Sequence, residues 1–123
     1  MKKPVLVVDD DTRITDFLKL AIEDSGEFEV TVMNQPLKAV ETAKRIQPVF
    51  VFLDVEMPHL TGGDIAFQMR SEVSLKNVPI VFLTGMATEE DIKESNLIAG
   101  YPFLVKPVKS EQVLECLRKY IKK

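Results

Sequence analysis

The 123-residue chain has little of what stabilises secreted or thiolate-metal proteins, with one cysteine and one histidine. A single cysteine, Cys116, cannot form an internal disulfide, so a reducing cytoplasm is the expected compartment. No apolar run approaches the ~20 residues that a membrane span needs. Residues 1–3 lead directly into a short apolar run rather than a signal sequence. We therefore expect a cytoplasmic protein with no membrane partner.

The chain also lacks a strong excess of charge of either sign, with 16 basic and 19 acidic residues. The net charge of −3 comes from interspersed acids and bases. No cluster of Lys and Arg forms the basic face that direct nucleic-acid binding requires. The length suits one domain with a single sizeable core. We predict a single domain over residues 1–123 that makes no direct contact with nucleic acid.

Apolar runs alternate with helical patterns five times. Runs typical of strands cover residues 4–8, 49–53, 78–83 and 103–105, and residues 29–33 alternate as in a half-buried strand. Apolar residues at helical spacing follow each run, beginning near Asp11, Pro36 and Thr61 and covering residues 87–99 and 109–122. Because the connections are short, the strands must be parallel and the helices must cross over between them. This pattern predicts a three-layer, doubly wound α/β sheet.

The candidate site is organised around the stretch Val51-Phe52-Leu53-Asp54-Val55-Glu56-Met57-Pro58. Its apolar run stops at Asp54, and Pro58 cannot continue a buried strand, so the chain must turn between them. Asp54 is therefore expected where a buried strand reaches the surface of the sheet. A carboxylate there is either a solubilising loop residue or a reactive group.

Polar residues follow three other strand runs in the same way. Asp9 and Asp10 follow the first run, Thr84 ends the fourth, and Lys106 follows the fifth. Because parallel strands end at one edge, where ligands bind in the crevice, we expect these side chains to meet Asp54. The alternative is a solvated rim. Independent loops would not be expected to collect three acids, a hydroxyl and an amine at one edge.

The charges of this group predict a metal ion. Two like charges about 4 Å apart repel by about 4 kcal/mol at an effective dielectric constant near 20, so three carboxylates need compensation. Lys106 supplies one positive charge, and a divalent cation would supply the other two. Oxygen ligands without nearby His or Cys favour a hard ion, Mg²⁺ first and Mn²⁺ or Ca²⁺ less so. The site is suited to holding a phosphoryl group between a metal and a lysine.

These segments together resemble the receiver domain of response regulators from two-component phosphorelay systems, in the CheY-like superfamily. The resemblance covers essentially the whole chain. It rests on the order and spacing of Val7-Val8-Asp9-Asp10-Asp11, Leu53-Asp54-Val55-Glu56-Met57-Pro58, Leu83-Thr84-Gly85 and Lys106-Pro107. It implies the five-unit βα flavodoxin-like fold with strand order 2-1-3-4-5. It also implies a role in phosphorelay signal transduction.

The resemblance implies which residues hold the metal and the phosphoryl group. The aspartate that matches Asp54 accepts a phosphoryl group from a sensor histidine kinase or a phosphotransfer protein. Asp10 would ligate Mg²⁺ directly, Asp9 largely through water, and Asp54 and the backbone carbonyl of Glu56 would complete the protein ligands. Lys106 would pair with one phosphoryl oxygen.

The resemblance also implies a conformational switch. Thr84 would hydrogen-bond to another phosphoryl oxygen, and the space it leaves would let Phe103 rotate inward. Phe103 stands where the family more often has tyrosine, so it can report by packing but not through a hydroxyl; simple core packing is the alternative. The surface that would change for a downstream partner or output domain consists of residues 87–99, 103–105 and 109–122.

Other functional classes fit the sequence less well. Haloacid-dehalogenase phosphatases also use an aspartate after an apolar strand. They need a second Asp two residues on and Thr or Val two further, where this chain has Glu56 and Pro58. We therefore expect a signalling phosphoacceptor that promotes its own phosphorylation and dephosphorylation, not an enzyme. A degenerate receiver that acts only as a protein-interaction module is the main alternative, and a phosphorylation-dependent homodimer is left open.

Overall fold

The computed structural model describes residues 2–56, 61–85, 97–98 and 101–121. Its helices, including two short 3₁₀ helices labelled η, are α1 (Thr12–Glu23), η1 (Pro36–Lys38), α2 (Ala39–Ile46), α3 (Gly62–Arg70), η2 (Val73–Leu75) and α5 (Ser110–Tyr120). Its strands are β1 (Lys3–Val8), β2 (Phe28–Met33), β3 (Phe50–Asp54), β4 (Ile80–Thr84), β5 (Leu97–Ile98) and β6 (Tyr101–Val105). Within these described ranges, no helix is both long enough and apolar enough to cross a membrane.

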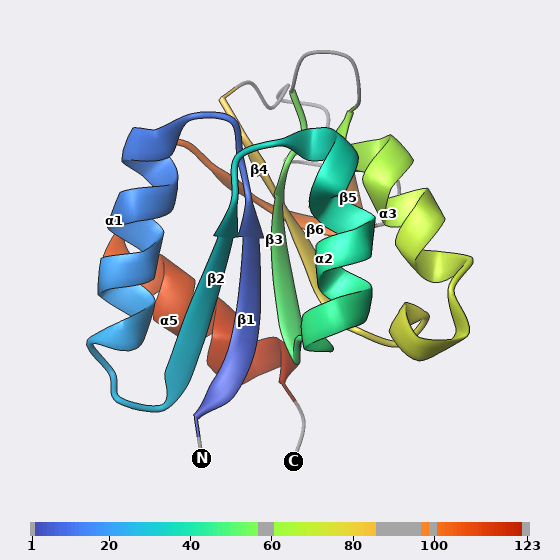
Figure 1. The fold of residues 1–123 in the computed structure, drawn as a ribbon. Coiled ribbons are helices and arrows are strands. Elements are labelled where there is room, and N and C mark those ends of the chain that lie inside the picture. Colours follow the sequence, from blue (N-terminus) through green and yellow to red (C-terminus); the bar gives the residue numbers. More distant parts are fainter. Residues whose placement is uncertain (1, 57–60, 86–96, 99–100, 122–123) are drawn as a thin grey trace.

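The strands form one sheet in the spatial order β2-β1-β3-β4-β6-β5. Its first five members are parallel, and β6 is the fifth strand of the predicted order. The predicted doubly wound α/β fold is therefore confirmed. The carboxyl ends of these strands point to the same edge, at the top of Figure 1.

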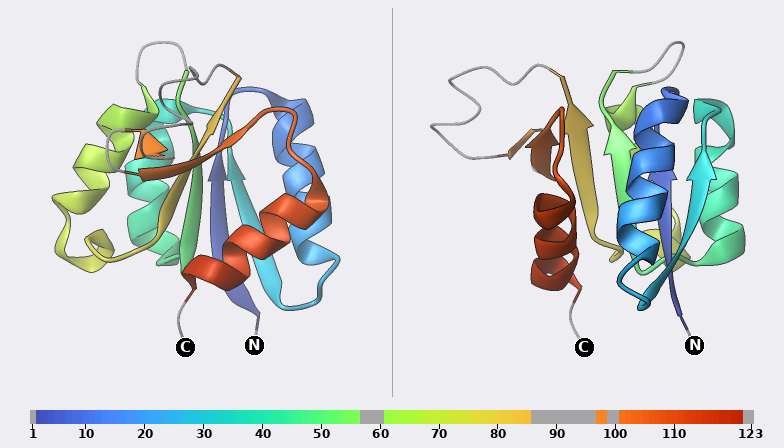
Figure 2. Two further views of the ribbon diagram at one scale, coloured as in Figure 1. Left: turned by 180° about the vertical axis from the view of Figure 1, so that it is seen from behind. Right: turned by 90° about the vertical axis from the view of Figure 1, so that its left-hand side faces the viewer.

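Helices cover both faces of the sheet. α1 and α5 lie on one face, and α2 and α3 lie on the other (Figures 1 and 2). Side chains alternate between the two faces along each strand. Because helices cover both faces, the central strands β3 and β4 are buried on both sides and are apolar up to their last residue. The α1–α5 side buries Val5, Val7, Phe50 and Phe52, and the α2–α3 side buries Leu6, Val8, Val51 and Leu53.

Side-chain caps start two helices next to the edge where the strands end. The Asp11 carboxylate accepts a hydrogen bond from the N–H of Arg13 at 3.0 Å and caps α1. Thr61 accepts from the N–H of Asp64 at 3.1 Å, and Asp64 accepts in return from the N–H of Thr61 at 3.2 Å. This capping box fixes the start of α3 shortly after β3.

The predicted helix over residues 87–99 lies mostly outside the described residues, and its end is wrong. Leu97–Ile98 forms β5, which runs antiparallel to β6 opposite Pro102 and Tyr101. Strand β6 begins at Tyr101 instead of the predicted Phe103. The longer β6 offers backbone partners to β5, and this pairing replaces the helical hydrogen bonds that the sequence pattern suggested. The sheet therefore has a sixth, antiparallel strand.

Two side chains of α1 bind the backbone of β2. The Glu23 carboxylate accepts from the N–H of Val30 at 2.9 Å, and the Lys19 ammonium donates to the carbonyl of Val30 at 3.1 Å. Lys19 also pairs with Glu23 at 2.9 Å. The hydrogen bond from Val30, followed by the one from Lys19, lowers the pKa of Glu23. These contacts join α1 to the outermost strand of the sheet.

Candidate metal and phosphoryl site

The strand ends bring the predicted site residues to one edge. β1 lies beside β3 with Val8 paired to Leu53, so Asp9 follows β1 at the level where β3 ends in Asp54. Thr84 is paired with Val105, so Lys106 follows β6 directly beyond the end of β4. The parallel register therefore places the last residues of the central strands at nearly the same height along the strand direction.

Three carboxylates form the centre of the site. Asp9 is fully buried and Asp54 is 3% exposed, whereas Asp10 is exposed. One oxygen from each carboxylate lies within 4.8 Å of the others. The convergence of the three acids that the sequence predicted is therefore observed.

Lys106 lies against two of these acids. Its Nζ is 2.9 Å from Oδ2 of Asp9 and donates a 3.1 Å hydrogen bond to Oδ1 of Asp54. The Lys106 N–H donates to the carbonyl of Thr84 at 2.7 Å, which extends the pairing of β4 and β6 by one residue. The Lys106–Pro107 peptide bond is cis. The hydrogen bond to Thr84 holds the lysine at its backbone, and the contacts with Asp9 and Asp54 hold its ammonium group.

The electrostatics of the site raise the pKa of Asp54. Burial, and then the charge of Asp9, raise the pKa of Asp54 to about 6, although Lys106 opposes this rise. Burial disfavours the charged form of Lys106, but the adjacent carboxylates of Asp9 and Asp54 outweigh burial and raise its pKa. One lysine therefore compensates only part of the negative charge of the cluster.

The donor set fits a hard divalent cation. Oδ1 of Asp9 accepts from the N–H of Asp11 at 2.9 Å. Oδ2 of Asp9 is buried and close to Lys106, yet within the described part of the chain it makes no hydrogen bond of suitable geometry. A buried carboxylate oxygen without a hydrogen bond is costly, and such oxygens are the ligands that Mg²⁺ prefers. Asp9, Asp10 and Asp54 are the carboxylates that would hold the ion.

The other predicted residues surround this cluster. Thr84 is buried at the end of β4. Glu56 is exposed, and its N–H donates to Oδ1 of Asp54 at 3.3 Å; the metal-binding role of its carbonyl stays a prediction. Phe103 lies beside Phe82 in the register and packs against the apolar cluster on the α2–α3 side. Its packing contact is observed, and its switching role stays a prediction.

Gly62 lies directly against the backbone of Asp54. Its N–H donates to the carbonyl of Val55 at 3.1 Å. A Cβ at Gly62 would lie 3.1 Å from the carbonyl carbon of Asp54 and from the Cα of Val55, and closer still to the carbonyl oxygen of Asp54. Only glycine allows so close an approach of two backbone segments. The first turn of α3 therefore supports the end of β3.

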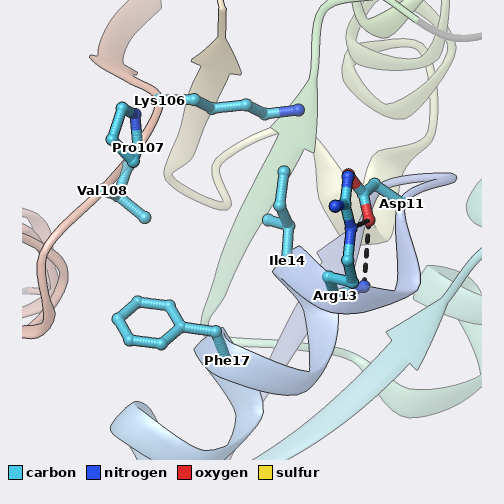
Figure 3. Close-up of a pocket in the computed structure, with 7 residues that line it drawn as sticks. All are labelled: Asp11, Arg13, Ile14, Phe17, Lys106, Pro107 and Val108. Carbon is cyan, nitrogen blue, oxygen red and sulfur yellow. Dashed lines mark hydrogen bonds and ion pairs between the residues drawn. The ribbon is translucent and has the colours of Figure 1, made fainter.

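A pocket of about 480 Å³ opens beside Lys106. Figure 3 shows Ile14 and Phe17 extending from α1, with Pro107 and Val108 across from them on the segment that follows β6. The remaining lining residues are Asp11 and Arg13, which form an ion pair of 3.1 Å. The pocket is thus lined mainly by apolar side chains and has the lysine of the site at its border.

The sequence analysis missed a group that supports the acids. Asn34, which follows β2, donates from Nδ2 to the carbonyl of Asp9 at 2.8 Å and to Oγ1 of Thr15 at 3.1 Å. One signal could have revealed it, because Asn34 also stands at the carboxyl end of a parallel strand. No sequence spacing indicates its second partner, Thr15, which is fully buried on α1.

Comparison with known proteins agrees with this geometry. The family model of the response regulator receiver domain matches residues 5–118. The chain belongs to this family. The receiver chain is 32% identical over 117 residues to an uncharacterized 14.6 kDa protein of Leptolyngbya boryana, covering 94% of this chain and 88% of that protein.

A longer relative and two solved structures extend the comparison. The receiver chain is 26% identical to the DNA-binding response regulator MtrA of Mycobacterium tuberculosis H37Rv over 96% of its own length, and it spans about half of MtrA (50%). Chemotaxis protein CheY4 of Vibrio cholerae has a TM-score of 0.85 at 28% identity, covering 98% of this chain and 99% of that one.

The second structure is the receiver domain of the sensor histidine kinase PA1611 from Pseudomonas aeruginosa PAO1. It has a TM-score of 0.85 at 23% identity, and the alignment covers 98% of each chain. That structure contains a magnesium ion coordinated in its active site cleft. At this identity the likeness shows a shared fold.

Proposed function

We propose that this receiver chain accepts a phosphoryl group on Asp54 from a phosphohistidine and passes the resulting signal to a partner. One observation carries the proposal: the Lys106 ammonium lies within 3.1 Å of both Asp9 and Asp54, beside three carboxylates that lie within 4.8 Å of one another. A site with fixed positive charge beside a carboxylate and a metal-binding acid pair suits phosphoryl transfer, which depends mainly on positioning and electrostatics.

Asp54 would be the nucleophile in this reaction. An oxygen of its carboxylate attacks phosphorus, the phosphorus–nitrogen bond breaks, and the imidazole nitrogen of the donor keeps the electron pair. Lys106 would pair with one phosphoryl oxygen, and the hydroxyl of Thr84 would donate to another. Mg²⁺, when held by the acids and the Glu56 carbonyl, supplies positive charge that offsets the charge of the phosphoryl oxygens.

The signal would pass through Thr84 and Phe103. Phosphorylation adds roughly −1.5 to −2 charge at Asp54, and this charge would draw Thr84 toward the phosphoryl group. Phe103 would then pack further inward. The reshaped surface would comprise β6 and α5 together with residues 87–96, which lie outside the described part of the chain.

The partners follow from this role. The donor would be a sensor histidine kinase or a phosphotransfer protein in the cytoplasm, and the pocket beside Lys106 offers it an apolar contact next to the lysine that binds Asp54. The downstream partner that responds to the signal would be a separate protein, an output domain or a second copy of this chain. The MtrA comparison supports an output domain in longer relatives, because MtrA is about twice as long as this receiver and is named as DNA-binding.

The direct test is the intact mass of the protein after incubation with acetyl phosphate and Mg²⁺. The wild type is expected to gain one phosphoryl group, and Asp54→Asn is expected to gain none, because an amide oxygen is not the nucleophile that the transfer needs. Asp16→Asn, which removes an exposed carboxylate of α1, is the matched control and should be labelled like the wild type.

Either of two results would contradict this assignment. Labelling of Asp54→Asn equal to the wild type would move the acceptor to another residue. No labelling of the wild type, with Mg²⁺ binding demonstrated in the same sample, would favour the alternative of a degenerate receiver that acts only as a protein-interaction module.

The metal assignment makes a second prediction. Asp10→Asn is expected to weaken Mg²⁺ binding by at least about tenfold, because it removes one of three negative ligands and charge count sets the affinity of such sites. Isothermal titration calorimetry at constant pH and ionic strength would measure the change. Asp16→Asn is again the control, and an unchanged dissociation constant in Asp10→Asn would refute the metal site.

A further inference from the structure

The backbone of Asp9 is held at its N–H and at its carbonyl by the end of β2. The N–H of Asp9 donates to the carbonyl of Met33 at 3.2 Å. The carbonyl of Asp9 accepts from Nδ2 of the next residue, Asn34, at 2.8 Å. Two consecutive residues therefore bind both backbone polar groups of Asp9.

The amide of Asn34 has a second acceptor that fixes its orientation. Nδ2 also donates to Oγ1 of Thr15 at 3.1 Å, while the hydroxyl of Thr15 donates to the carbonyl of Thr12 at 3.1 Å. The two N–H groups of one amide thus match two acceptors. An oxygen at the Nδ2 position would face a carbonyl oxygen and a hydroxyl whose proton is already used, so only a donor fits there.

This arrangement connects three elements around the acids: the end of β2, the loop after β1 and the first turn of α1. The Asp9 carbonyl belongs to the same planar peptide as the N–H of Asp10. Holding that carbonyl therefore fixes the plane from which the Asp9 and Asp10 side chains both extend. A rotation of this peptide would move both carboxylates relative to Asp54.

From this geometry we propose that Asn34 is a positioning residue of the site, which sets the spacing of the Asp9 and Asp10 carboxylates for a divalent cation by holding the peptide between them. The inference rests on the proposed function, because it assigns Asn34 to the same metal site. Asn34 does not itself ligate the ion in this proposal. Thr15 orients the Asn34 amide.

The test is a Mg²⁺ titration of Asn34→Ala by calorimetry. Loss of a group that orients a metal ligand typically weakens binding 10- to 100-fold, and we expect a dissociation constant raised by about tenfold or more. Thr15→Val should give a smaller rise, because the Asn34–Asp9 bond remains. The double variant should bind no more weakly than Asn34→Ala, since Thr15 acts through Asn34.

A second measurement separates positioning from a general loss of structure. The Mg²⁺ concentration for half-maximal labelling by acetyl phosphate should rise in Asn34→Ala, whereas the labelling rate at saturating Mg²⁺ should change less. Asn77→Ala, an exposed residue at the opposite edge of the sheet, is the matched control and should leave both values unchanged. If Asn34→Ala does not fold, Asn34→Gln keeps the amide but misplaces it and should show the same rise.

The outcomes distinguish this inference from the function on which it rests. If Asp10→Asn binds Mg²⁺ weakly and Asn34→Ala binds it like the wild type, the positioning role is wrong and the metal site stands. If neither variant changes the dissociation constant, the metal site itself is wrong. A fall in thermal stability of Asn34→Ala with an unchanged dissociation constant would assign Asn34 a structural role alone and overturn the proposal.

Discussion

Gly62→Ala is expected to destabilise the fold by about 1–3 kcal/mol, the usual cost of forcing extra atoms into a packed site. The new methyl group would overlap the carbonyl oxygen of Asp54 and lie 3.1 Å from the Cα of Val55. Both are backbone atoms of the strand end, so neither can turn aside as a side chain could. The free energy of unfolding from urea titration measures the loss.

Gly63→Ala provides the matched control for this substitution. A methyl group at Gly63 would meet only Oγ1 of Thr61, at 3.6 Å, which is an ordinary contact. Alanine is favoured over glycine within a helix by roughly 0.5–1 kcal/mol, so Gly63→Ala should be neutral or stabilising. Equal losses in the two variants would show that contact with β3 is not the reason for glycine at position 62.

Gly62→Ala should also weaken Mg²⁺ binding, because the displaced peptide carries Asp54.

Lys106→Met is the second substitution with a large expected effect. In metal-free protein at pH 8 it should lower the free energy of unfolding by about 3 kcal/mol, because removing one partner of a buried ion pair leaves the other charges uncompensated. Methionine keeps most of the side-chain volume, so the loss reports on charge. Lys76→Met, at an exposed lysine, should change stability little.

The same loss should depend on pH in a defined direction. The pKa of Asp54 is about 6 in the folded protein, above its ordinary value of 3.8, so ionised Asp54 costs stability as pH rises through this range. Without Lys106 that pKa rises further, because the ammonium no longer favours the carboxylate. The destabilisation should therefore be larger at pH 8 than at pH 4.5, as measured by urea unfolding in EDTA.

A double variant tests whether the loss comes from the carboxylates. Asp54→Asn combined with Lys106→Met should be more stable than Lys106→Met alone, since it removes one of the uncompensated charges. If the change in the free energy of unfolding of the double variant equals the sum of the changes in the two single variants, the residues act independently. A loss in Lys106→Met that is the same at both pH values would also contradict the electrostatic explanation.

The acids could be located from the sequence because each one ends or follows an apolar run. Parallel strands end at one edge of the sheet, and this rule predicts that Asp9, Asp54 and Lys106 lie close together although they are far apart in the chain. The same rule, applied to the second strand, would have pointed to Asn34. It would not have shown what Asn34 does, because the role of its amide depends on Thr15, and only the packing of α1 on β2 brings the two together.

Two other features needed the three-dimensional backbone. The pattern around Thr61 predicted the start of a helix, but not that Gly62 would touch the carbonyl of Asp54, since that contact depends on how α3 returns over β3. The pair Leu97–Ile98 continued a helical pattern in the sequence and is a strand in the fold. A short apolar pair has no periodicity of its own, so its partner β6, a non-local element, determines its conformation.

The contacts of Lys19 and Glu23 with Val30 have a consequence for how copies of this chain can associate. An outer strand usually presents unpaired N–H and C=O groups, onto which a strand of another molecule can add. At the middle of β2 both groups are already bound by an ammonium and a carboxylate. A second copy would have to displace this ion pair to extend the sheet there. These contacts therefore oppose edge-to-edge pairing at the middle of β2.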